Sequence, residues 1–343
     1  MQNECVVITG ERAVELQPME LDETLGAGEI LVETECTFIS AGTELSIYTG
    51  TEAMARQPGA WSAWPFACGY ANVGRGRAVG EGVSTFAPGD RVFSLAGHGR
   101  YAKLSTDALL VPVPSELGPD IAVASRMAGV ATTAVTVAAF GMDPWVVVFG
   151  LGMVGNLAAQ ACRIQGGRVI GVDPVASRRT LAETCGIPHT TGGDAETVRA
   201  DIERITGGAM AAITVEAVGH TGVIRQALGV TADFGQLVLL GTPRAPVETD
   251  ATAFFNDIHL RWITVRGALE WNLPLYPGKG LEGQGIGASL YAKQNAIFDW
   301  IVRGELRIEP LVSHRVPPEE VKAAYEGLLN EPETYTGVVL DWR

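Results

Sequence analysis

The stretch Trp145-Val-Val-Val-Phe-Gly-Leu-Gly-Met-Val-Gly155 decides the fold class of this chain. Its apolar run Trp145–Phe149 has the length and composition of a strand that is buried on both faces. Three glycines follow with the spacing G-x-G-x-x-G, and the segment Asn156–Arg163 after them has the composition of a helix. A strand, a glycine-rich turn and a helix in this order are typical of a dinucleotide-binding βαβ unit.

Each glycine has its own part in holding a dinucleotide. Gly150 allows a tight turn at the end of the strand, Gly152 lets the backbone approach a pyrophosphate, and Gly155 allows the helix to pack closely on the strand. The N-terminus of the following helix offers free N–H groups to the anion, and Met153 and Val154 lie in the glycine motif just before it. We therefore expect residues 150–155 to bind the cofactor.

The end of the next expected strand bears on which nucleotide is bound. Arg168–Val172 is followed by Asp173, and an acidic side chain there accepts hydrogen bonds from ribose hydroxyls and repels a 2′-phosphate. Arg178 and Arg179 come soon after and are able to hold a 2′-phosphate. We expect NAD as the cofactor and keep NADP as the alternative. The other interpretation of Asp173 is a turn residue before Pro174.

The pattern along the chain indicates two kinds of structure. Residues 1 to about 120 are β-rich, with Gly- and Pro-bearing turns, and from Trp145 to about Arg266 strands and helices alternate, as in a parallel sheet with crossover helices. An irregular stretch then runs to about Gly287. The expected strands are Glu4–Thr9, Glu29–Thr37, Arg91–Leu95, Tyr101–Leu104, Arg168–Val172, Ile213–Glu216, Gln236–Leu240, Trp262–Arg266 and a last one in Thr336–Asp341; helices are expected at Leu290–Arg303 and Glu319–Leu329.

Composition narrows the class of partner. The 343 residues carry a net charge of −14, and no cluster of Lys or Arg stands out, so we expect no nucleic-acid partner. The apolar runs are too short to span a membrane, and no signal peptide is visible. The five cysteines include no C-x-x-C pair, which argues against a disulfide framework. We expect a cytoplasmic protein that acts on a small-molecule substrate.

Several further stretches, taken with this order of elements, resemble the medium-chain dehydrogenase/reductase superfamily over essentially the full length. They are Ala87-Pro-Gly-Asp-Arg-Val92, Val215-Glu-Ala-Val-Gly219, Leu240-Gly241 and Val338-Val-Leu-Asp341. The resemblance implies an α/β protein in which a GroES-like, β-rich catalytic domain accompanies a Rossmann cofactor domain. The implied boundaries are 1–121 for the N-terminal part of the catalytic domain, 122–266 for the Rossmann domain and 267–343 for the returning segment. It also implies cofactor contacts at Val218, Gly219, Leu240, Gly241 and Gly267, and a homodimer or homotetramer.

The chain departs from the zinc-dependent members of that family at the metal ligands. The family's Cys-Gly-Thr-Asp-like motif is replaced by Ala41-Gly-Thr-Glu44, and its Gly-His-Glu motif by Gly69-Tyr-Ala71. The third ligand position falls near Arg126-Met-Ala128, which provides no thiolate or carboxylate. A catalytic zinc ion needs three N, S or O ligands from the protein, so we expect no zinc. The resemblance is closest to a zinc-free subgroup that includes bacteriochlorophyllide dehydrogenase, which oxidises a secondary alcohol.

Without a metal ion, a side chain or a water molecule must handle the hydroxyl proton. The resemblance places Tyr70 at a zinc-ligand position and Thr43 at the family's proton-relay position. Glu44 is a candidate base if buried, and His98 suits proton exchange with solvent. Each has a structural alternative: Tyr70 as a filler of the vacant metal site, Glu44 as a salt-bridge partner and His98 as a surface-loop residue.

The expected substrate pocket contains aromatic residues from irregular segments. Trp61, Trp64 and Trp271 are able to stack on a ring or sugar face, and Ser40 lies in the same segment as Thr43. Packing of each tryptophan against its own loop is the alternative.

Three functions remain open from the sequence. The leading hypothesis is an NAD-dependent dehydrogenase or ketoreductase for a secondary alcohol on a sugar, cyclitol or other polar ring. The second is a zinc-free quinone or enoyl reductase that uses NADPH. The third is a dinucleotide-binding protein without catalysis. Cofactor preference and hydride exchange separate them.

Overall fold

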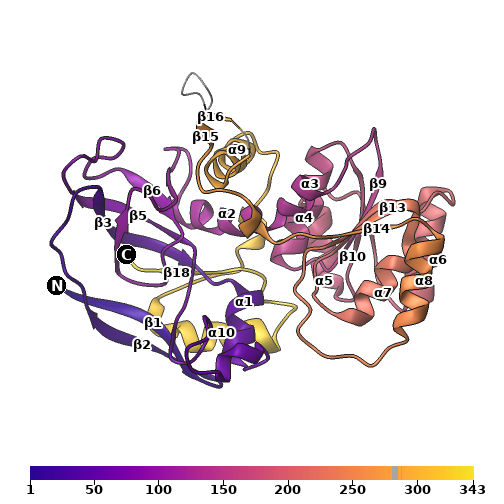
Figure 1. The fold of residues 1–343 in the computed structure, drawn as a ribbon, viewed down its shortest axis with the longest axis horizontal. Helices are drawn as coiled ribbons and strands as arrows, with labels where there is room; N and C mark the ends of the chain where they lie inside the picture. Colours follow the sequence, from indigo (N-terminus) through magenta and orange to yellow (C-terminus); the bar gives the residue numbers. More distant parts are fainter. Residues whose placement is uncertain (280–284, 287) are drawn as a thin grey trace. The chain divides into compact units, whose positions relative to one another are not determined.

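The computed structural model describes residues 1–279, 285–286 and 288–343, and it divides into two compact units (Figure 1). We name residues 1–126, 273–304 and 312–343 the β-rich unit, and residues 127–272 and 305–311 the central unit. Helix α2 (Pro119–Ala131) contains the first boundary between them. Within the described residues, no helix is long and apolar enough to cross a membrane.

The central unit is built on a six-stranded parallel sheet, counted within the described residues. The strand order is β11-β10-β9-β12-β13-β14, so the first strand lies in the middle and the chain winds outward in both directions. That order is the doubly wound Rossmann order. The strands are β9 (Trp145–Phe149), β10 (Arg168–Val172), β11 (His189–Thr191), β12 (Ala211–Glu216), β13 (Thr231–Leu239) and β14 (Thr264–Gly267). The helices are α3 (Thr133–Val137), α4 (Met153–Ile164), α5 (Ala176–Thr184), α6 (Ala195–Thr206), α7 (Thr221–Val230) and α8 (Ala251–Leu260), with short 3-10 turns η2 (Glu270–Asn272) and η3 (Glu309–Leu311).

The central strand β9 provides three fully buried apolar residues to the sheet of this unit. Val146, Val147 and Val148 are fully buried, because β9 has a strand on each side and helices cover the sheet. Segment 305–311 joins the same unit: the Gln160 amide donates to the Arg307 carbonyl at 3.0 Å, and the Arg307 N–H donates back to the Gln160 side chain at 2.7 Å.

The β-rich unit holds a seven-stranded sheet, again within the described residues. The order is β17-β18-β3-β5-β6-β8, with β7 also pairing β3. The last strand, β18 (Val338–Asp341), pairs antiparallel with β3 (Glu29–Phe38), so the C-terminal segment returns to complete the sheet (Figure 1). The other strands of this sheet are β5 (Asn72–Val79), β6 (Arg91–Ser94), β7 (Tyr101–Ser105), β8 (Leu110–Pro112) and β17 (His314–Val316). The predicted fold class, a GroES-like β-rich domain with a Rossmann domain, is confirmed.

A smaller sheet and several helices complete the β-rich unit. The sheet has the order β2-β1-β4, from β1 (Gln2–Gly10), β2 (Ala13–Glu20) and β4 (Phe66–Ala67). The helices are α1 (Ala41–Tyr48), α9 (Leu290–Val302) and α10 (Val321–Asn330), with η1 (Ala53–Arg56) and η4 (Pro318–Glu320). The irregular stretch expected before Gly287 includes the hairpin β15 (Gly278–Lys279) and β16 (Gly285–Ile286), and residues 280–284 and 287 of it lie outside the described residues.

The structure differs from the expected elements at several places. Helix α1 covers the Ala41-Gly-Thr-Glu44 motif, which carried no helix prediction, and α4 begins at Met153 instead of Asn156. Strand β13 begins at Thr231, five residues before the expected start at Gln236, because Thr231 at its start pairs with Ala211 beyond a register shift. Short strands such as β11 were not expected.

Candidate functional site

The glycine turn, residues 150–155 between β9 and α4, has the geometry of a dinucleotide cradle. Gly150 has φ +87°, a conformation that residues with a side chain rarely adopt. A Cβ on Gly155 would lie 1.8 Å from the Gly150 carbonyl oxygen, so no side chain fits between helix and turn. A Cβ on Gly152 would meet no atom within 4 Å, and no side chain caps α4 there. Free N–H groups in the first turn, at Met153 and Val154, thus have open space in front of them and fit a pyrophosphate.

Asp173 closes one side of this turn. It is 2% exposed, and its two carboxylate oxygens accept the N–H groups of Leu151 at 2.7 Å and Val175 at 2.8 Å. The Arg178 guanidinium lies 3.9 Å from the same carboxylate, while the Arg179 guanidinium donates to the Asp173 main-chain carbonyl at 2.7 Å. The carboxylate is therefore fixed at the glycine turn, and each oxygen keeps a lone pair for a ligand hydroxyl.

The ends of β12 and β13 lie backbone against backbone beside the turn. A Cβ on Gly241 would lie 2.2 Å from the Gly219 nitrogen, and a Cβ on Gly150 would lie 2.7 Å from a Val218 methyl group. Glu216 is fully buried and accepts the N–H groups of Val218 and Gly219 at 2.9 Å. Burial raises the pKa of Glu216 despite these hydrogen bonds. Sequence reasoning did not single out Glu216, which holds this loop.

The other predicted contacts of the central unit lie at the same strand ends. Leu240 is 9% exposed and directly follows β13. Gly267 is the last residue of β14, and a Cβ there would meet no atom within 4 Å. Their cofactor contacts remain predictions.

In the β-rich unit, the structure brings Ser40 and Tyr70 together as a hydroxyl pair. The Tyr70 hydroxyl and Ser40 Oγ share a short hydrogen bond. Ser40 is buried as the N-cap of α1, while Tyr70 is half-buried in the loop before β5. The Arg126 guanidinium, from α2, lies over the Tyr70 ring with its carbon 5.0 Å from the ring centre.

Four buried side chains, those of Glu44, Cys68, His98 and Tyr325, lie together next to this pair, and we name them the carboxylate cluster. Glu44 Oε1 accepts the Ser40 N–H at 2.7 Å. Its Oε2 lies 2.9 Å from His98 Nε2 and accepts the Tyr325 hydroxyl at 2.5 Å, and that hydroxyl lies 3.3 Å from Cys68 Sγ. Burial by itself would raise the pKa of Glu44, but the charge and hydrogen bond of His98 and the two other donors outweigh it and lower that pKa.

Comparisons with known proteins relate the chain to dehydrogenases. A family model described as zinc-binding dehydrogenase matches residues 153–275. The L-threonine 3-dehydrogenase of Bacillus licheniformis is 24% identical over 87% of each chain, and the 2-desacetyl-2-hydroxyethyl bacteriochlorophyllide A dehydrogenase of Rhodobacter capsulatus is 25% identical over 100% of this chain and 99% of its own. The chain is an oxidoreductase that is similar to these dehydrogenases. An Escherichia coli oxidoreductase of unknown specificity has the same fold, with a TM-score of 0.83, 18% identity and 99% coverage of both chains.

The carboxylate cluster raises the question of a metal ion in this dehydrogenase. Ligand atoms of Glu44, Cys68 and His98 all lie within 4.8 Å of one another. Tetrahedral zinc ligands at about 2.05 Å from the ion lie roughly 3.3 Å apart, whereas the Glu44 oxygen is 2.9 Å from His98 and 2.5 Å from Tyr325. Burial raises the pKa of Cys68 well above its ordinary value. In this structure Glu44, Cys68 and His98 are joined with Tyr325 in a hydrogen-bond network.

Of the other predicted residues, Thr43 lies next to the hydroxyl pair, because its N–H donates to the Ser40 carbonyl at 3.1 Å. Trp64 donates its indole N–H to the Ile47 carbonyl at 3.1 Å and packs on an apolar core, and the exposed Trp61 packs edge-on against Phe66. Trp271 is 55% exposed in η2 of the central unit. Trp64 therefore has a packing role, which was the alternative to stacking on a substrate. Thr43 is half-buried in the first turn of α1.

Three residues of this region were not singled out from the sequence. Tyr325 belongs to α10, far along the chain, Cys68 was counted only among the cysteines, and Arg126 was noted only for lacking a ligand atom. A weak signal existed for Arg126, because an arginine within an otherwise apolar helix needs a partner.

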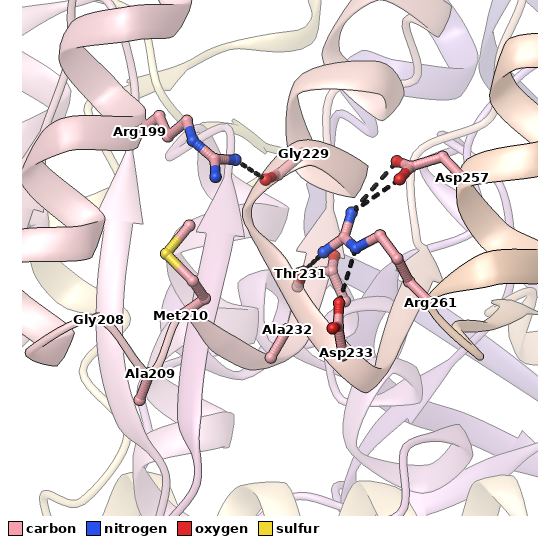
Figure 2. Close-up of a pocket in the computed structure, with 10 residues that line it drawn as sticks. All are labelled: Arg199, Gly208, Ala209, Met210, Gly229, Thr231, Ala232, Asp233, Asp257 and Arg261. Atoms are coloured by element: carbon pink, nitrogen blue, oxygen red, sulfur yellow. Dashed lines mark hydrogen bonds and ion pairs between the residues drawn. The ribbon is translucent and has the colours of Figure 1, made fainter.

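A hollow of about 690 Å³ lies near the beginnings of β12 and β13 in the central sheet, lined by the residues drawn in Figure 2. The two arginines of the hollow already have partners from its own lining. Arg261 donates to Asp233 at 2.9 Å, to Asp257 at 3.2 Å and to the Thr231 carbonyl, and Arg199 donates to the Gly229 carbonyl (Figure 2). The hollow is at the amino-terminal end of β12 and β13, whereas ligands of this fold bind at the carboxyl-terminal ends of the strands. We therefore do not place the cofactor here.

Proposed function

We propose that this dehydrogenase interconverts a secondary alcohol and a ketone and handles the hydroxyl proton with protein side chains, without zinc. The observation that carries the proposal is the hydroxyl pair of Ser40 and Tyr70, in which Tyr70 occupies a position where zinc-dependent members of the family hold the metal and Ser40 directly precedes Ala41 at another. The likeness to L-threonine 3-dehydrogenase and to bacteriochlorophyllide A dehydrogenase supports alcohol chemistry. The substrate class we propose is a small molecule with a sugar, cyclitol or other polar ring.

The side chains divide the work in the following way. In ketone reduction the Tyr70 hydroxyl gives its proton to the carbonyl oxygen, and Ser40 Oγ holds that oxygen or the phenol oxygen by a hydrogen bond. In alcohol oxidation the same proton returns to Tyr70. The nicotinamide supplies the hydride chemistry when bound. Glu44 holds the Ser40 backbone in place.

The central unit binds the nucleotide in this proposal, with NAD preferred to NADP. The fixed carboxylate of Asp173 supports NAD, because its charge repels a 2′-phosphate. Arg178, whose guanidinium lies 3.9 Å from that carboxylate, favours the second candidate, an NADPH-dependent quinone or enoyl reductase. A homodimer or homotetramer in the cytoplasm, without nucleic-acid or membrane partners, completes the proposal.

The first experiment is calorimetric titration with NAD(H) and NADP(H), with zinc measured on the same sample. The proposal expects NADH to bind more tightly than NADPH and turnover to survive chelation. Stoichiometric zinc whose removal abolishes turnover would contradict the zinc-free chemistry. Preference for NADPH, with reduction of a conjugated C=C, would favour the second candidate.

The variant Tyr70→Phe tests the role of the Ser40–Tyr70 hydroxyl pair, with kcat and KM measured on a panel of polyols and cyclic alcohols. We expect kcat to fall at least a hundredfold with little change in KM. Tyr101→Phe is the matched control, because its hydroxyl accepts a hydrogen bond from Arg77 at 3.1 Å on the surface. A Tyr70→Phe enzyme with wild-type kcat would make Tyr70 a filler.

A further inference from the structure

A buried positive charge lies beside the hydroxyl pair and has no part in the chemistry described so far. Arg126 is 3% exposed, and its guanidinium carbon is 5.0 Å from the centre of the Tyr70 ring. Arginine stays protonated in proteins, and a buried charge is costly unless its surroundings stabilise it. The ring face contributes to that stabilisation as a cation–π partner.

The same contact acts on Tyr70 when its proton leaves. A phenolate shares its negative charge between the oxygen and the ring, so a cation over the ring attracts the phenolate more strongly than the phenol. For unit charges about 6 Å apart at an effective dielectric constant near 20, the attraction corresponds to roughly a hundredfold in equilibrium.

Other charges near the pair act in the opposite or a weaker sense. Glu44 reaches Ser40 through its backbone N–H and carries a negative charge that disfavours a second anion. His98 Nε2 lies 2.9 Å from the other oxygen of that carboxylate. Arg126 is the cation in contact with the Tyr70 ring itself.

We propose that Arg126 is a positioning residue that acts through Tyr70, so that Ser40, Tyr70 and Arg126 form one hydroxyl–phenol–guanidinium group. In ketone reduction, the carbonyl carbon gains a hydride, the O–H bond of Tyr70 breaks, and the proton moves to the substrate oxygen. The phenolate left behind is stabilised by Arg126 and by the Ser40 hydroxyl. In oxidation the phenolate takes the alcohol proton back. This inference rests on the proposed function of Tyr70.

The test compares Arg126→Gln with Arg126→Lys, measuring kcat, KM and the melting temperature of the whole enzyme. We expect Arg126→Gln to lower kcat tenfold to a hundredfold with KM within about threefold, and Arg126→Lys to recover most of the loss because it keeps the charge. Arg77→Gln is the matched control, because Arg77 lies over the Tyr101 ring at 5.3 Å on the surface. Equal losses in the Gln and Lys variants, or none in the Gln variant, would overturn the inference.

A double-mutant cycle separates this inference from the proposed function. If Arg126 acts through Tyr70, Arg126→Gln costs less than about threefold in a Tyr70→Phe background. A silent Tyr70→Phe refutes the proposed function, whereas a damaging Tyr70→Phe with an additive Arg126→Gln refutes only the inference. If Arg126→Gln does not fold, Arg126→His provides the test. Its kcat relative to wild type should fall between about pH 6 and pH 8 as the imidazole loses its charge, and a flat ratio overturns the inference.

Discussion

The glycine turn of the central unit and the carboxylate cluster of the β-rich unit are built in opposite ways. The glycine turn is local: residues 150–155 form it without side chains at three positions, and at Gly155 the Gly150 backbone fills the space that a side chain would need. The carboxylate cluster is assembled from four separate segments, and each member depends on hydrogen bonds to the others. A local backbone feature leaves a motif in the sequence, while a dispersed polar network leaves only isolated residues. The two regions should also respond differently to substitution.

The largest effect is expected at Gly155. A Cβ there would lie 1.8 Å from the Gly150 carbonyl oxygen, and backbone cannot yield as a side chain can. We expect Gly155→Ala to lower the free energy of unfolding by about 4 kcal/mol or more and to abolish dinucleotide binding. Gly229→Ala is the control, because a Cβ at that helical position meets nothing within 4 Å. Denaturant unfolding and calorimetry measure both, and wild-type stability of Gly155→Ala would remove the steric reason for this glycine.

The next effect concerns the carboxylate of Glu44. In Glu44→Gln the amide NH2 group replaces one carboxylate oxygen and faces either the Ser40 N–H or the side chains of His98 and Tyr325, so at least one buried hydrogen bond is lost together with the charge. We expect a loss of about 3 kcal/mol in unfolding free energy. Glu326→Gln is the control: Glu326 accepts the Tyr48 hydroxyl at 2.7 Å but lies at the surface, so its loss should stay below about 1 kcal/mol.

The pH dependence of that difference has a definite sign. The pKa of Glu44 is lower in the folded protein than its ordinary 4.5. The carboxylate therefore stabilises the fold above pH 4.5, and this contribution is lost as the pH falls through the folded-state value. Wild type and Glu44→Gln should converge in stability on acidification. A difference that grows toward low pH would mean that Glu44 is protonated in the fold.

A smaller effect is expected at Asp173, which belongs to the local region but acts through its side chain. Asp173→Asn should weaken NADH binding about tenfold and NADPH binding less, since the repulsion of a 2′-phosphate disappears. Asp194→Asn is the control, because Asp194 also accepts a backbone N–H, that of Thr197, as the N-cap of α6. An unchanged ratio of the two dissociation constants would remove Asp173 from the ribose role.

Particular residues show how far sequence reasoning reached. Trp145–Phe149 and the glycines after it predicted the Rossmann core because a buried parallel strand and a tight turn each require specific neighbouring residues. Glu44 was a candidate base, but its partners Tyr325 and Cys68 lie in distant segments, and only the folded chain brings them together. Helix α1 was missed because Ala41-Gly-Thr-Glu44 was interpreted as a ligand motif, and Gly42 weakens the helical signal.

The smallest effect is expected at Cys68, which tests whether the cluster is a network or a metal site. Burial raises the pKa of Cys68 well above its ordinary 9.0, so the thiol stays protonated and contributes two weak contacts, with the Tyr325 hydroxyl and the Val6 carbonyl. Cys68→Ser should therefore change stability by about 1 kcal/mol or less and leave kcat unchanged, and native Cys68 should resist alkylation at pH 8 while half-buried Cys5 reacts more readily. Mass spectrometry of the alkylated protein locates the modified thiol. If Cys68→Ser instead lowered the free energy of unfolding by several kcal/mol and released a bound metal ion, Cys68 would be a thiolate ligand. The cluster would then be a metal site, and metal coordination would be what distinguishes it from the glycine turn.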